Sequence, residues 1–196
     1  MRIGIDARIA DYTAGGTARY TAQLVAGMRE VGPSDVELVA VRSRKQRAGA
    51  PDIPAHETIT VWTPPHHRLE RYVLPWELRS ARFDVLHSPD FIPPKGRWRK
   101  VITVHDLAFL RMPELVTDAS RRYYGGIQRA VREADAIIAV SRATARDLVE
   151  LAGAPAEKVS VVYEAADSTL KPMPTEEAAA AVRERFGLEG QYILFV

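Results

Sequence analysis

The chain has 196 residues, of which 46% are hydrophobic and 27% charged, and its 27 basic and 25 acidic residues give a net charge of +2. These values are typical of globular proteins and exclude a wholly disordered, collagen-like or coiled-coil chain. The absence of cysteine excludes disulfides, a thiolate zinc site and a cysteine nucleophile. No apolar run approaches the ~20 residues of a membrane span, and Asp6 and Arg8 interrupt any signal-peptide core. We therefore expect a soluble, cytoplasmic protein.

The N-terminal part of the sequence alternates predicted strands with predicted helices. Arg2 to Ala7 predicts a strand, and a loop with Gly15 and Gly16 follows it. Apolar residues at Leu24, Met28 and Val31 lie at positions i, i+4 and i+7, which predicts a helix over 18–31. The next expected elements are a strand over 36–41, a surface loop over 43–57, a strand over 59–62, a helix over 68–82 and a strand over 84–87.

The same alternation continues towards the C-terminus. The expected elements are strands over 100–104, 135–140 and 159–163, and helices over 118–133 and 142–152, the second of them capped by Ser141. Several of these strands are continuous apolar runs, which is typical of strands with both faces buried. The order predicts an α/β fold, with a Rossmann-like, mostly parallel sheet and helices on both faces.

The last residues predict a change of organisation. A Pro-containing linker over 171–174 precedes a helix that begins at Thr175 and ends near Gly187, and an apolar strand follows over 192–196. An apolar strand with no partner invites association through its edge. We therefore expect an N-terminal domain over 1–170, a linker and helix over 171–190, and the first strand of a further domain over 191–196.

Gly15 and Gly16 are the first candidate site. They lie just before a helix N-terminus, where free backbone N–H groups and the lack of side chains suit a phosphate. The alternative is that the glycines only make the turn. Their spacing is not the G-x-G-x-x-G of dinucleotide-binding proteins, so NAD binding has little support.

The pair His105-Asp106 is the second candidate, because it directly follows the strand over 100–104. Ligands of open parallel sheets bind outside the carboxyl ends of the strands. The alternative is a loop histidine beside a capping aspartate. His87 has a weaker case at the end of another strand, and the remaining histidines, His56, His66 and His67, are expected in surface loops. No H-E-x-x-H motif or D-x-D pair supports a metal site.

The stretch 66–83 mixes arginines with aromatic and aliphatic residues. This pattern suits contact with an anionic acceptor or a membrane surface. The alternative is an ordinary amphipathic helix packed on the sheet. No long basic run or basic–aromatic repeat occurs, so we expect no nucleic acid among the partners.

Five segments in order resemble glycosyltransferase family 4, the group 1 glycosyltransferases of GT-B fold, and its mannosyltransferase-like members in particular. They are Arg2-Ile3-Gly4-Ile5-Asp6, Gly15-Gly16-Thr17-Ala18-Arg19-Tyr20, Asp84-Val85-Leu86-His87-Ser88, the segment 101–107 with His105-Asp106-Leu107, and the segment 134–141. Residues 158–167 resemble the segment that closes the family's N-terminal domain. Here Glu164-Ala165-Ala166-Asp167 stands where many members carry an Asn-Gly pair. Residues 192–196 resemble the first strand of the C-terminal domain.

The resemblance implies a retaining enzyme that transfers a sugar from a nucleotide sugar, such as GDP-mannose or a UDP-sugar, to a glycan or lipid-linked acceptor, without metal or cofactor. It implies that Gly15 and Gly16 lie against the donor diphosphate and that His105 lies by the reacting sugar carbon. Arg19, Asp106 and Asp11 are expected to orient the acceptor or a loop. The donor is bound mainly by the C-terminal domain in this family, so the chain is expected to be incomplete for catalysis. A lipid-linked acceptor implies contact with the inner face of the membrane.

Three other functions stay open at this point. The first is a self-contained doubly wound module that binds a small molecule or phosphate without catalysis. The second is an NAD-linked oxidoreductase, which needs the fingerprint that this sequence lacks. The third is an epimerase acting on a nucleotide sugar, which would need further carboxylates. The fold class alone does not choose among them.

Overall fold

The computed structural model describes residues 1–67, 69–115, 125–167 and 170–194. The chain forms two compact units, Met1–Glu164 and Ala165–Val196. The first unit contains the sheet and every candidate site residue. The second contains one described helix, α8 (Thr175–Phe186), with a glycine in the left-handed conformation, Gly187 at φ +65°, directly after it.

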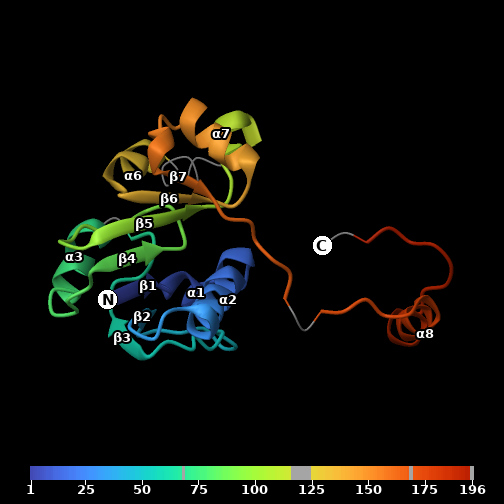
Figure 1. The fold of residues 1–196 in the computed structure, drawn as a ribbon. Helices are drawn as coiled ribbons and strands as arrows, with labels where there is room; N and C mark the ends of the chain where they lie inside the picture. Colours follow the sequence, from blue (N-terminus) through green and yellow to red (C-terminus); the bar gives the residue numbers. More distant parts are fainter. Residues whose placement is uncertain (68, 116–124, 168–169, 195–196) are drawn as a thin grey trace. The chain divides into compact units, whose positions relative to one another are not determined.

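The sheet of the first unit is seven-stranded, and all its neighbouring strands pair in parallel (Figure 1). Its order is β3-β2-β1-β4-β5-β6-β7. The strands are β1 (Arg2–Asp6), β2 (Glu37–Ser43), β3 (Glu57–Val61), β4 (Val85–Ser88), β5 (Arg99–Val104), β6 (Ala136–Ala139) and β7 (Val159–Val161). This confirms the predicted parallel α/β sheet.

Both faces of the sheet are buried, as β2 shows. Leu38 and Ala40 belong to one apolar cluster, which also contains side chains of helices α1 (Arg8–Tyr12) and α2 (Gly16–Val31). Val39 and Val41 belong to another cluster, which contains side chains of α3 (Glu70–Glu77). Because successive side chains of a strand point to opposite faces, these helices cover opposite faces of the sheet.

A third cluster fills the other half of the sheet, around β5 and β6. It includes Ile127 and Val131 of α6 (Ile127–Glu133) and Leu148 of α7 (Arg142–Glu150). The shorter elements are α4 (Ala108–Arg111) and the 3₁₀ turns η1 (Pro113–Leu115) and η2 (Ala156–Lys158). Ser141 caps α7 as predicted, since its Oγ accepts a bond of 3.0 Å from the Thr144 N–H.

The largest differences between the observed and the predicted helices concern α1, α3 and α6. Helix α1 was not predicted, because its five residues are too few for an apolar period. Helix α3 is shorter than the predicted 68–82 and ends at Glu77, two residues after Pro75, whose ring and missing N–H disrupt a helix interior. The start of the helix predicted over 118–133 lies outside the described residues, and α6 forms its end.

The strand predicted over 192–196 is not formed at residues 192–194, and its last two residues lie outside the described chain. A strand requires a neighbour for its backbone N–H and C=O groups, and this segment pairs with no described strand. The division of the chain at residues 170 and 190 stays a prediction. No helix in the described ranges is both long and apolar enough to span a membrane.

Gly4 gives a test of the packing in the middle of the sheet. An added Cβ would lie 2.8 Å from Leu86 Cδ1 and 2.9 Å from the Phe83 ring. We expect Gly4→Ala to lower the free energy of unfolding by roughly 1–3 kcal/mol, the usual cost of overpacking, as measured by urea titration.

The matched control is Gly27→Ala in the middle of α2, where a Cβ meets nothing within 4 Å. This variant should gain about 0.5–1 kcal/mol, because alanine loses less backbone entropy than glycine in a helix. Equal effects of the two substitutions would contradict the close packing of β1 against Phe83 and Leu86.

Candidate functional site

The sheet order indicates a candidate site at the carboxyl ends of β1 and β4. These strands are neighbours, but from β1 the chain continues to β2 and β3 on one side, and from β4 to β5, β6 and β7 on the other. In open α/β sheets, ligands bind in the crevice at such a change of direction. Asp6 ends β1, Ser88 ends β4, and His105 directly follows β5.

His105 is held from three sides. Its Nε2 donates a bond of 3.0 Å to the backbone oxygen of Pro89, and its Nδ1 lies 2.9 Å from Glu164 Oε1. The hydroxyl of Thr144, in the first turn of α7, donates a bond of 3.1 Å to the His105 backbone oxygen. The ring is thereby fixed in orientation, and the side chain remains 26% exposed.

Tyr20 brings helix α2 into contact with the same histidine. Its ring meets the His105 ring edge-on, with 5.0 Å between the centroids. The Tyr20 hydroxyl lies 3.2 Å from Thr103 Oγ1, which lies 2.8 Å from Nε2 of the buried His87. Tyr20 is four residues from Gly16, so the N-terminus of α2 lies about one helical turn from this contact.

The N-terminus of α2 is open. Gly15 is its N-cap with φ −154°, an extended conformation that any residue adopts, and no side chain caps the helix. A Cβ added to Gly15 or Gly16 would meet nothing within 4 Å. Neither the backbone nor packing within the described chain therefore requires glycine at Gly15 or Gly16.

The three residues predicted to orient the acceptor or a loop lie apart. Arg19 is exposed in the first turn of α2 and forms no ion pair with a described residue. Asp106 Oδ1 accepts a bond of 3.0 Å from the Ala108 N–H at the start of α4. Asp11 is buried and pairs with Arg42, and it also accepts a bond of 2.6 Å from the Ser43 N–H. Asp11 and Asp106 thus hold backbone segments, while Arg19 faces solvent.

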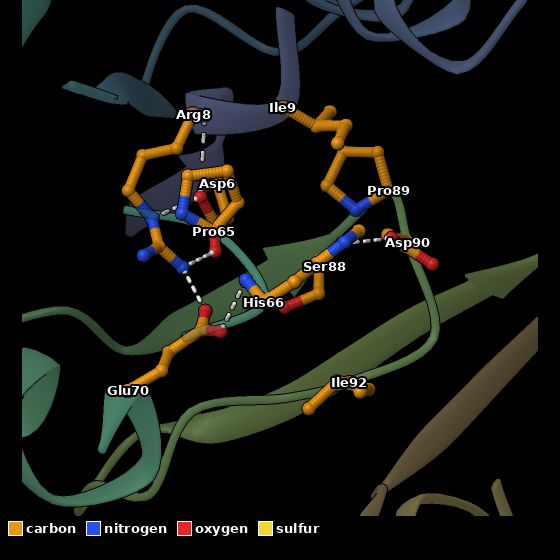
Figure 2. A pocket seen from close by; sticks show the side chains of 10 residues that line it. All are labelled: Asp6, Arg8, Ile9, Pro65, His66, Glu70, Ser88, Pro89, Asp90 and Ile92. Atoms are coloured by element: carbon orange, nitrogen blue, oxygen red, sulfur yellow. Dashed lines mark hydrogen bonds and ion pairs between the residues drawn. The ribbon is translucent and has the colours of Figure 1, made fainter. Parts of the chain in front are cut away.

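A buried ionic network at the end of β1 was not predicted (Figure 2). Arg8 donates from Nε and Nη2 to the two oxygens of Asp6, at 2.8 and 2.6 Å, and from Nη1 to the Thr63 backbone oxygen at 3.0 Å. Nη2 also pairs with Glu70, whose other oxygen accepts a bond of 2.7 Å from the His66 N–H.

The network shifts the pKa values of Arg8 and Glu70. Burial lowers the pKa of the Arg8 guanidinium, but Asp6 and Glu70 outweigh burial and hold that pKa above its ordinary value. Burial also raises the pKa of Glu70, against the opposing effect of Arg8. Arg8 is 1% exposed, so its charge is balanced inside the protein rather than by solvent.

Beside this network lies a cavity of about 20 Å³. It is lined by Asp6, Arg8, Ile9, Pro65, His66, Glu70, Ser88, Pro89, Asp90 and Ile92 (Figure 2). His66, expected in a surface loop, lies here with φ +64°, and its Nε2 is 2.8 Å from Asp90 Oδ2. No local sequence pattern predicts that these residues meet, because they come from three separate segments of the chain. In the described parts of the chain, no group of three acidic or histidine side chains is placed to hold a metal ion.

His87 gives a pH test of the interior beside the site. Burial lowers the pKa of His87 from 6.5 to about 4. Between those values the unfolded chain binds more protons than the folded one, so stability falls as the pH falls from 6.5 towards 4. The loss at the acid end is on the order of 3 kcal/mol.

We expect His87→Gln to flatten this dependence, as measured by urea unfolding at pH 4.5 and 6.5. The amide keeps a polar group near Thr103 but does not titrate. A slope in the variant as steep as in the parent would show that other groups govern the acid sensitivity.

Comparison of the sequence with models of known protein families identifies a family match over most of the chain. The model of Glycosyltransferase Family 4 matches residues 14–170. A D-inositol 3-phosphate glycosyltransferase of Thermobispora bispora is 28% identical over 214 aligned positions, which cover 93% of this chain and 48% of that protein.

Two solved structures share the fold at lower identity. A sucrose-phosphate synthase of Thermosynechococcus elongatus matches 96% of this chain and 53% of its own with a TM-score of 0.63 and 14% identity. HepE of Anabaena, solved with UDP and glucose, matches 95% of this chain and 50% of its own with a TM-score of 0.58 and 18% identity. The chain spans about half the length of these relatives.

Proposed function

Because this chain belongs to glycosyltransferase family 4, we propose that it is the acceptor-side half of a retaining enzyme that transfers a sugar from a nucleotide sugar to a glycan or lipid-linked acceptor. The D-inositol 3-phosphate glycosyltransferase of Thermobispora bispora is about twice as long as this chain. The complex of HepE with UDP and glucose supports a nucleotide sugar as donor, with a UDP-sugar or GDP-mannose as the first candidates. The complete reaction requires the donor-binding half as well.

One observation carries the proposal: the open N-terminus of α2 and the fixed ring of His105 lie next to each other, joined by the Tyr20–His105 contact. A diphosphate against Gly15 and Gly16 would accept bonds from the free N–H groups of the first turn. The sugar attached to it would then lie towards His105, at the carboxyl ends of the central strands.

This placement gives the residues of the chain two tasks. As the bond between the anomeric carbon and the diphosphate oxygen breaks, negative charge grows on the diphosphate, where the helix dipole and N–H groups stabilise it without reorganisation. His105 contacts the sugar, and of its two ring contacts the one with the half-exposed Glu164 is the one that a sugar hydroxyl can replace. No step in this proposal uses a metal.

The first test substitutes the two contacts separately, in a protein that carries this chain together with its donor-binding half. We expect His105→Ala to lower transfer by 10²–10³-fold, the range for loss of one preorganised group. Gly16→Ala should lower it by at least tenfold while leaving thermal stability unchanged, because the added methyl meets only the donor. The measurement is release of UDP or GDP from UDP-glucose and GDP-mannose.

Gly27→Ala in the same helix is the control and should transfer at the parent rate, since it lies far from the helix N-terminus. The 196-residue chain by itself should bind either donor only weakly. Micromolar affinity of the chain alone would contradict the proposal and would favour a self-contained phosphate-binding module. Full activity of Gly16→Ala would contradict the contact between the donor diphosphate and Gly16.

We also propose that α3, together with Leu69 directly before it, forms a peripheral membrane contact at the cytoplasmic leaflet. Leu69, Tyr72 and Trp76 are 55%, 65% and 65% exposed. Basic groups accompany the aromatic rings: Arg79 lies 4.1 Å from the Trp76 ring centroid and Lys95 5.2 Å from that of Tyr72. Exposed apolar side chains beside cationic ones suit an anionic bilayer surface.

The test compares binding to phosphatidylglycerol and phosphatidylcholine vesicles by co-sedimentation. We expect Trp76→Ser with Tyr72→Ser to weaken binding to the anionic vesicles at least tenfold. Phe186→Ser is the control, because Phe186 is also an exposed aromatic residue beside an arginine but belongs to α8. An equal loss of vesicle binding in the Phe186→Ser control and in the double variant would mean that any exposed aromatic side chain contributes to binding. That result would contradict a specific role of α3.

A further inference from the structure

We infer that Glu164 is a positioning residue for sugar transfer: its carboxylate keeps a hydrogen on Nδ1 of His105, so that the ring presents an N–H group to the donor sugar. The inference rests on the proposed function for the part that His105 plays in transfer. The hydrogen stays bonded to Nδ1 throughout, so the contact with the sugar is a hydrogen bond and no proton is transferred.

The first observation is that two acceptors face the two ring nitrogens. The Pro89 backbone oxygen lies 3.0 Å from Nε2, and Glu164 Oε1 lies 2.9 Å from Nδ1. A backbone oxygen and a carboxylate both accept hydrogen bonds, whereas a neutral imidazole has one N–H group and one lone pair. Since Nε2 donates to Pro89, Nδ1 bonds to the carboxylate only when it also carries a hydrogen. The geometry therefore fits the doubly protonated ring of His105.

The second observation is that the sheet itself brings Glu164 to His105. Strand β7 pairs in parallel with β6, and β6 pairs with β5, which leads directly to His105 (Figure 1). The pairing continues beyond β7, because the Val162 N–H donates a bond of 3.0 Å to the Ala139 backbone oxygen. The carboxyl ends of β5 and β7 are thus two strand spacings, about 10 Å, apart. A glutamate and a histidine side chain together span this distance, so the contact follows from the strand order.

The third observation is the fixed direction of Nδ1. The ring is bonded at Nε2 to Pro89, the His105 backbone oxygen accepts a bond of 3.1 Å from the Thr144 hydroxyl, and the Tyr20 ring meets the imidazole edge-on. Turning Nδ1 away from Glu164 would break the bond to Pro89, so the two groups stay opposite each other. The bond to Glu164 lies on the exposed side of the ring, whereas the bond to Pro89 is partly buried. A donor sugar can therefore approach Nδ1.

The charged and titratable neighbours of the ring single out Glu164. Tyr20, from α2, is neutral at neutral pH, because burial raises the pKa of its hydroxyl and the charge of Glu164 adds to this effect. Asp90, which follows the residue bonded to Nε2, interacts with a different histidine. Asp106 accepts a backbone bond at the start of α4, and α7 contributes a hydroxyl that does not titrate. Glu164 is therefore the carboxylate in direct contact with the His105 ring.

The hydrogen on Nδ1 changes what the ring offers to an incoming sugar. A neutral ring that donates from Nε2 has a lone pair at Nδ1, which can accept from a hydroxyl but cannot donate to a sugar oxygen. The doubly protonated ring donates there, and charged donors form hydrogen bonds about twice as strong as neutral ones. The His105–Glu164 pair has no net charge in total, so it offers this N–H group without adding net positive charge beside the reacting carbon.

The first test reads the ring nitrogens of the 196-residue chain, labelled with ¹⁵N-histidine, by NMR at pH 7 without any donor. We expect the fraction of His105 with a hydrogen on Nδ1 to be at least about twofold higher in the parent than in Glu164→Gln. The glutamine keeps the shape of the side chain, but its amide donates to Nδ1 and so favours the neutral ring. The His105 signals are identified by their loss in His105→Gln.

Glu157→Gln is the matched control. It removes the same charge at the other end of β7, in η2, where Glu157 is exposed and makes none of the His105 contacts described above. This control should leave the His105 signals as they are in the parent. A neutral His105 ring in the parent, or the same fraction in Glu164→Gln as in Glu157→Gln, would overturn the inference.

The second test measures transfer by a protein that carries this chain together with its donor-binding half. We expect Glu164→Gln to lower kcat/KM by about threefold to fivefold, the upper range for a half-exposed ion pair. The defect should shrink as the pH falls from 7.5 to 6.0, because the neutral ring of the variant then takes up a proton from solvent. Acid would not relieve the loss of a purely structural contact.

The kinetic result has clear contradicting outcomes. Equal kcat/KM of Glu164→Gln and Glu157→Gln, or a defect that does not shrink in acid, would overturn the role of Glu164 in transfer. Absence of transfer by the parent would contradict the proposed function and, with it, that role. The NMR experiment uses no donor, so it decides the hydrogen on Nδ1 independently of that outcome.

Discussion

The buried guanidinium of Arg8 is the interaction on which the candidate site depends. It joins the end of β1 through Asp6, the loop after β3 through the Thr63 backbone oxygen, and the start of α3 through Glu70. Glu70 in turn holds the backbone of His66 in a left-handed conformation. Losing one partner of such a buried pair leaves an uncompensated charge at a cost of about 3–5 kcal/mol, so these segments keep their positions together.

The candidate site combines a restrained side chain, His105, with an unobstructed helix N-terminus, that of α2. His105 is restrained by contacts of its two ring nitrogens, its backbone oxygen and the ring itself. The partners in these contacts come from four different segments of the chain: Glu164, Pro89, Thr144 and Tyr20. The glycines at the start of α2 are unobstructed, because no described side chain occupies the space beside them. A rigid contact group next to a free helix N-terminus is what stabilisation of a developing charge requires, since no reorganisation is needed during the reaction.

The amino-acid sequence by itself determined the order of the elements, the parallel sheet and the two leading candidates. Continuous apolar strands separated by amphipathic helices are local patterns. They place Gly15-Gly16 at the start of a helix and His105 at a strand end without any knowledge of packing. Only the tertiary structure decided which distant side chains meet. Arg8 reaches Glu70, 62 residues away, and His105 reaches Glu164, 59 residues away. Such contacts follow from loop paths and helix positions, which apolar periodicity does not encode. This is why the buried network of Arg8 and the cavity beside it were not predicted.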